Sequence, residues 1–152
     1  MSTTLAAPPS TQDLKLSYRF RAPREKVFAA FSTIEVVKQW FGPPTCQIGD
    51  GMMDFRVGGR YRFVVAGTEG KVAVSGEFLE ITPPEKICYS WKWEDDEDWV
   101  DVDSTVTFEF HAHGNETEMH MTHVGFPNEE SRGKHGEGWQ GSFVKLDAYV
   151  GA

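Results

Sequence analysis

The sequence contains few cysteines, fewer basic than acidic residues, and no long apolar run. Of its 152 residues only two are cysteines, and Cys46 and Cys88 are too far apart to form a Cys-x-x-Cys pair. Two separated cysteines do not make the disulfide framework of a small secreted domain, so we expect free thiols in a reducing compartment. Lysine and arginine number 15 against 23 acidic residues, a formal charge of −8. This balance argues against a nucleic-acid partner, which needs a basic face.

Membrane segments and secretion signals are also missing. No apolar run approaches the roughly 20 residues that span a bilayer. The start of the chain, MSTTLAAPPSTQ, lacks the basic beginning and the apolar centre of a signal peptide. We therefore expect a cytoplasmic protein that does not insert into a membrane. Residues 1–12 are rich in Ser, Thr, Ala and Pro and predict a flexible tail, which leaves 13–152 as one domain.

Aromatic residues, by contrast, are abundant at 13% of the chain, and five of them are tryptophans. Many occupy every second position of a segment, which is typical of half-buried strands. The clearest example is KICYSWKWE at 86–94, which we expect to form a single strand. About six such strands follow one another between residues 46 and 124, and another covers 14–21.

Helical patterns fill the remaining parts of the chain. Two short helices are predicted within 23–41, the second with a capping box formed by Ser32 and Glu35. A long helix is predicted over 128–150, where apolar residues recur at helical spacing. Strands joined by short turns give an antiparallel sheet, so the fold class is α+β, with the last helix covering the aromatic face.

All five histidines lie between positions 111 and 135, and strand parity separates them. A type II′ turn at Gly114-Asn115 places His111, His113 and His120 on the polar outer face, beside glutamates. Only His123 points inward from this hairpin. A metal site on the outer face is one interpretation, but the exposed, loose spacing favours a solvated ladder of histidine and glutamate. We therefore predict neither a metal nor another cofactor.

The inner face of the same hairpin pairs Phe110 with Met119, Phe108 with Met121, and Val106 with His123. Solid packing is one interpretation of this aromatic face. The other is a ligand cavity between the sheet and the last helix, with His123 and His135 as polar contacts. The predicted ligand-binding residues are Trp40, Phe63, Tyr89, Trp91, Phe108, Phe110, Met119, Met121, His123, His135, Trp139 and Phe143.

Six segments in a fixed order carry a resemblance to a known family. They are RFRAPREKVFAAFST, VKQWFGP, VGGRYRF, GEFLEITPPEKICYSW, MTHVGF and HGEGWQGSFVKLDAYV. From about Leu14 to Val150 the chain resembles the bacterial relatives of the activator of the heat-shock protein 90 ATPase. This is a START-like, or SRPBCC, family.

The resemblance implies a helix-grip fold of β-α-α-β6-α order, a curved antiparallel sheet wrapped around a long C-terminal helix. It also implies a cavity for hydrophobic ligands, and it carries over no set of catalytic residues. The first functional hypothesis is therefore the binding of a small hydrophobic or aromatic molecule. The alternatives are a cyclase- or hydrolase-like enzyme that uses His123 as acid or base, and a chaperone-associated module that uses the acidic segment 94–103.

Overall fold

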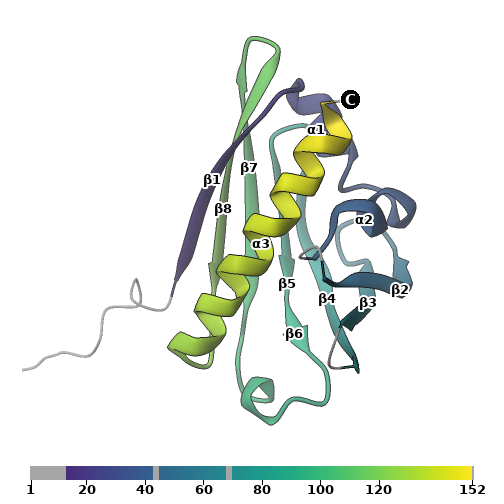
Figure 1. Cartoon of the computed structure of the whole chain (residues 1–152), viewed down its shortest axis with the longest axis vertical. Helices are drawn as coiled ribbons and strands as arrows, with labels where there is room; N and C mark the ends of the chain where they lie inside the picture. Colours follow the sequence, from purple (N-terminus) through teal and green to yellow (C-terminus); the bar gives the residue numbers. More distant parts are fainter. Residues whose placement is uncertain (1–12, 43–44, 68–69, 152) are drawn as a thin grey trace, which may run out of the picture.

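The computed structural model describes residues 13–42, 45–67 and 70–151, and in it one long helix crosses one face of an antiparallel sheet (Figure 1). In chain order the elements are β1 (Leu14–Phe20), α1 (Arg24–Ala29), α2 (Ile34–Trp40), β2 (Gln47–Met53), β3 (Arg60–Gly67), β4 (Gly70–Thr82), β5 (Lys86–Ser90), β6 (Lys92–Trp93), the short 3-10 helix η2 (Glu97–Trp99), β7 (Thr105–His113), β8 (Glu116–Val124) and α3 (Glu129–Val150). The predicted tail, 1–12, lies outside the described residues.

The sheet has the strand order β1-β8-β7-β5-β4-β3-β2, and every neighbouring pair is antiparallel. It curves around α3, and α2 lies beside that helix (Figure 1). The predicted helix-grip fold is therefore confirmed. The late hairpin has the predicted register, with Phe108 opposite Met121 and Val106 opposite His123. Gly114 has φ +60°, the left-handed value that the predicted turn needs.

The prediction of a single strand over 86–94 is wrong in one respect. The chain leaves the ladder at Trp91, whose backbone N–H donates to the Ser104 carbonyl at 2.9 Å. Before this point β5 pairs with both β4 and β7, whereas β6 after it pairs with β4 alone. The aromatic alternation continues through the break, so the sequence pattern did not reveal it.

The predicted capping box is also wrong. The N-cap of α2 is Thr33, and no side chain caps this helix. The Ser32 hydroxyl instead donates to the carbonyl of Ala29, at 2.6 Å, so it closes the preceding turn. Helix α3 does have a side-chain cap, because the Asn128 side chain accepts from the Ser131 N–H at 2.8 Å.

The core lies between the concave face of the sheet and α3. Its centre is formed by Phe108, Met119 and Met121 from the hairpin, with Phe143 and Leu146 from α3, and all of these side chains are buried. These residues fill the middle of the space between the sheet and α3. Any space for a ligand must therefore lie toward the ends of this interface.

Candidate functional site

One space, here called the outer cavity, lies between the first half of α3, the loop after α2, and strands β3, β4 and β6. Its volume is about 300 Å³. Aromatic and aliphatic side chains form most of its wall, together with a few small or polar residues. Its lining consists of Phe41, Gly42, Cys46, Val65, Val72, Trp91, Trp93, Lys134, His135, Gly138, Trp139 and Ser142.

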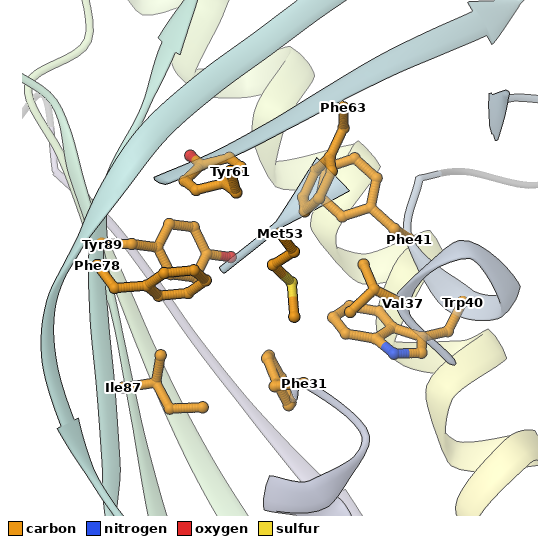
Figure 2. A pocket seen from close by; sticks show the side chains of 10 residues that line it. All are labelled: Phe31, Val37, Trp40, Phe41, Met53, Tyr61, Phe63, Phe78, Ile87 and Tyr89. Carbon is orange, nitrogen blue, oxygen red and sulfur yellow. The ribbon is translucent and has the colours of Figure 1, made fainter. Parts of the chain in front are cut away.

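A second space, here called the inner cavity, lies deeper, between α2 and strands β2 to β5. Figure 2 shows its lining, which consists of Phe31, Val37, Trp40, Phe41, Met53, Tyr61, Phe63, Phe78, Ile87 and Tyr89. The inner cavity has a volume of about 20 Å³, room for about one water molecule. A small organic ligand needs several hundred cubic ångströms and a mainly apolar wall, and of these two spaces only the outer cavity offers both, so it is the candidate site.

His135 forms part of the wall of the outer cavity and accepts hydrogen bonds from two tryptophans. Its Nε2 atom accepts from the indole N–H groups of Trp93 at 2.8 Å and Trp91 at 3.3 Å. An indole nitrogen can only donate, so Nε2 carries no proton and Nδ1–H donates to the Ser131 carbonyl at 2.7 Å. Burial lowers the pKa of His135, and the hydrogen bond to Ser131 opposes this effect. His135 is therefore a neutral acceptor that holds two walls of the cavity in place.

His123 is fully buried and is held by side chains on both sides. The Trp139 indole donates to its Nδ1 at 3.1 Å, so Nε2 carries the proton and donates to the Ser104 hydroxyl at 2.9 Å. Burial, and then the nearby His135, place the pKa of His123 well below its ordinary value. Both ring nitrogens are thus occupied, and His123 is not among the residues that line either cavity. In this arrangement it has no contact through which to exchange a proton with a ligand.

Helix α3 leaves space for the outer cavity because small residues face it. Gly138 and Ser142 are four positions apart and so lie on one face of the helix. The Ser142 hydroxyl donates to the Gly138 carbonyl at 2.9 Å and accepts from the Gly42 N–H at 2.7 Å. This second bond joins segments 100 residues apart and fixes the loop after α2 against the helix.

The predicted ligand-binding residues fall into three groups. Trp91, His135 and Trp139 line the outer cavity, and Trp40, Phe63 and Tyr89 line the inner one. The remaining predicted residues line neither cavity and pack in the buried core: Phe108, Phe110, Met119, Met121, His123 and Phe143. The reason is what packs against each of them: Phe108 lies against Trp139 and Phe143 of α3, and Phe110 lies against Phe28 and Phe31.

Several residues of the outer cavity were not predicted, among them Phe41, Cys46, Gly138 and Ser142. A feature of the sequence could have indicated Gly138 and Ser142. Small residues at i and i+4 beside Trp139 mark a helix face that leaves space in an otherwise aromatic interface. Phe41 and Cys46 gave no comparable signal, because they lie near a turn whose packing depends on α3.

The outer-face histidines are exposed or half-buried, as predicted, and they gather around Glu118. His120 Nε2 lies 2.7 Å from this carboxylate and His113 Nε2 3.7 Å from it. Hydrogen bonds from His120 and then Arg19 lower the pKa of Glu118. Among residues 13–42, 45–67 and 70–151, no group of three or more His, Cys, Asp or Glu side chains is arranged to hold a metal ion.

The acidic segment 94–103 is not simply an exposed connection. Trp99, in the middle of it, is buried, and its ring lies 5.3 Å from that of His135 and 6.2 Å from that of Phe126. The Asp96 carboxylate accepts from the Asp98 N–H at 3.0 Å and starts the turn that carries Trp99 inward. The segment therefore places the Trp99 ring beside His135 and Phe126, while most of its carboxylates stay at the surface.

Comparison with known proteins gives one family and several similar structures. The family model described as "Activator of Hsp90 ATPase homolog 1-like protein" matches residues 21–151. A protein from Chromobacterium violaceum is 25% identical, with a TM-score of 0.83 over 93% of this chain and 98% of that one. The AHSA1 protein of Silicibacter pomeroyi is 30% identical, with a TM-score of 0.80 over 91% and 96%. No curated protein is similar enough to count as a relative.

In the described part of the chain, no helix is both long enough and apolar enough to cross a membrane.

Proposed function

The chain belongs to the family of activator of Hsp90 ATPase homolog 1-like proteins, as its motifs predicted, and from this premise we propose that it binds a small, largely apolar molecule in the outer cavity. The cavity volume of about 300 Å³ is at the lower end of the range for small-molecule sites. This size suits a ligand of one or two rings rather than a long lipid chain.

One observation carries the proposal: every side-chain nitrogen and oxygen in the wall of the outer cavity already has a partner within the protein. The indoles of Trp91 and Trp93 donate to the half-buried His135, and that of Trp139 donates to the buried His123. Ser142 bonds to the backbone, and Lys134 pairs with Glu130 at 3.8 Å. A hydrocarbon surface can fill such a wall without leaving a polar group unpaired.

The same observation separates binding from catalysis. A general acid or base must reach the ligand with a free nitrogen or oxygen, and His135, the one histidine in the wall, already uses both ring nitrogens. Binding by shape and apolar contact is therefore the function that the geometry supports best.

The test uses isothermal titration calorimetry of the purified protein with anilinonaphthalene sulfonate, an aromatic probe whose sulfonate can face Lys134 at the rim. We expect one saturable site. The Gly138→Leu substitution places a leucine in the outer cavity and should weaken binding at least about tenfold, since one lost methylene contact is worth about 0.8 kcal/mol and several are lost.

The matched control is Gly133→Leu, on the same helix. Gly133 is exposed, and a Cβ added there meets nothing within 4 Å, so this variant should bind like the wild type. If Gly138→Leu folds and binds the probe as well as the control does, the outer cavity is not the site. Native mass spectrometry of the freshly purified protein gives a second readout, namely a co-purified small molecule that the Gly138→Leu variant lacks.

A further inference from the structure

The inner cavity contains a hydroxyl group that the protein itself does not use. Tyr89 is only 6% exposed, and its hydroxyl points toward Met53 at the centre of the lining residues (Figure 2). Within the described chain this hydroxyl makes no hydrogen bond. The neighbouring Tyr61 differs, because its hydroxyl donates to the Ser90 carbonyl at 2.5 Å. Because Tyr89 lines the inner cavity and its hydroxyl has no partner among the described residues, this hydroxyl is suited to pair with a group that enters from outside.

Among the described residues, Phe41 alone lines both cavities. Its ring lies 5.2 Å from the ring of Phe63 on the inner side, and 5.9 Å from those of Trp91 and Trp139 on the outer side. The Phe41 ring is therefore the wall between the two spaces. If it turns aside, they become one continuous cavity.

The backbone of Phe41 and Gly42 is hydrogen-bonded to α3, so only the side chain of Phe41 can move. The Gly42 N–H donates to the Ser142 hydroxyl, and the Lys145 ammonium donates to the Phe41 carbonyl at 3.4 Å. Both bonds fix the chain to α3. Rotation of the Phe41 ring about its side-chain bonds leaves them intact.

We propose that a ligand in the outer cavity turns the Phe41 ring aside and reaches into the inner cavity, where its leading atom accepts a hydrogen bond from the Tyr89 hydroxyl. This inference rests on the proposed function. It narrows the ligand class to flat apolar molecules with one carbonyl oxygen, ketone or aldehyde, at one end. The inner space of about 20 Å³ holds one such oxygen and little more.

Donation by Tyr89, rather than acceptance, follows from its surroundings. Burial raises the pKa of the Tyr89 hydroxyl, so it keeps its proton. The other side chains that line the inner cavity are apolar, except for Tyr61 and for the indole N–H of Trp40, which donates to the Ala30 carbonyl at 2.9 Å. An incoming acceptor therefore meets a single available donor.

The test compares two probes of the same shape, acetophenone and α-methylstyrene, in which a methylene group replaces the carbonyl oxygen. Their affinities are measured by NMR titration for the wild type, Tyr89→Phe and Tyr18→Phe. Tyr18 is the matched control, because its hydroxyl contacts Asp147 and it lines neither cavity. We expect Tyr89→Phe to lower the ratio of acetophenone to α-methylstyrene affinity about tenfold, the value of one buried hydrogen bond. Tyr18→Phe should leave the ratio unchanged.

A second measurement needs no substitution. Acetophenone should shift the NMR signal of the Tyr89 Cζ carbon and show magnetisation transfer between its methyl group and that of Met53, in the inner cavity. α-Methylstyrene should leave the Tyr89 Cζ signal in place.

The outcomes separate the two proposals. If both probes bind the wild type and Tyr89→Phe leaves their ratio unchanged, the Tyr89 subsite is overturned while ligand binding in the outer cavity stands. Contacts of the bound probe with Trp139 but none with Met53 overturn the subsite in the same way. If neither probe binds the wild type at all, both proposals are overturned.

Discussion

Acidification should destabilise this protein through the buried His123 and the half-buried His135. Both are neutral in the fold, and their unprotonated nitrogens accept indole hydrogen bonds from three tryptophans. Burial lowers the pKa of His123 and of His135 below the ordinary value of 6.5. As the pH falls through that value, the histidines of the unfolded chain become protonated while those of the folded chain stay neutral. The contribution of these histidines to the free energy of unfolding is therefore fully present above about pH 6.5 and decreases below it.

The size of the effect follows from the same linkage. Each histidine that stays neutral in the fold costs about 1.4 kcal/mol for every pH unit below the unfolded pKa. At about pH 5 the loss through His123 is thus roughly 2 kcal/mol, and His135, whose pKa is lowered against the opposing effect of its bond to Ser131, adds to this loss. This is a large share of the roughly 5–15 kcal/mol that a domain has in total.

The assay is urea unfolding, followed by tryptophan fluorescence, at a series of pH values between about 7 and 5. In His123→Asn the amide oxygen keeps an acceptor for Trp139, but the side chain does not titrate, so the pH slope should fall by about 1.4 kcal/mol per unit. His111→Asn, the same substitution at an exposed position, is the control. A wild-type slope in His123→Asn, or a folded-state NMR titration of His123 near its ordinary pKa, would refute the reasoning.

Further substitutions test the packing and the helix ends by urea or thermal unfolding. Phe108→Ala, at a completely buried position, should lower the unfolding free energy by about 3–5 kcal/mol, and a loss below about 1 kcal/mol would contradict its place in the core. Asn128→Ala removes the cap of α3 and should cost about 1 kcal/mol, whereas Gly133→Ala, at an exposed helical position, should add roughly 0.5–1 kcal/mol. Gly125 has φ +86° and no room for a Cβ, so Gly125→Ala should lower the melting temperature clearly, and an unchanged value would count against the tight turn there.

The sequence predicted the fold well where apolar residues recur with one period along a whole strand or helix. The hairpin register is one case, because a period of two and a Gly-Asn turn leave one pairing that puts both Met119 and Met121 inside. The break at Trp91 could not be predicted in this way. The residues on both sides keep the same alternation, and they differ only in their partner strands, since β5 pairs with β4 and β7 whereas β6 pairs with β4 alone.

The candidate site was predicted less well, for a physical reason. Aromatic side chains on the inner face are equally suited to filling a core and to lining a cavity. Phe108 fills the core and Trp91 lines the outer cavity, although both were predicted from the same alternation. Both rings lie beside Trp139, but Phe108 also packs against Phe143, whereas Trp91 lies beside His135 at the wall of the outer cavity.

The sequence by itself determined the periodicity of each element, the face on which each histidine lies and the family to which the chain belongs, because these depend on neighbours in the chain. Only the tertiary structure decided where the space lies. The outer cavity exists because Gly138 and Ser142 of α3 meet a loop fixed 100 residues earlier in the chain. The inner cavity is lined by side chains from α2 and four strands, and among them the hydroxyl of Tyr89 has no partner in the described chain. Empty space is a property of all the surrounding segments together, so no single segment could reveal it.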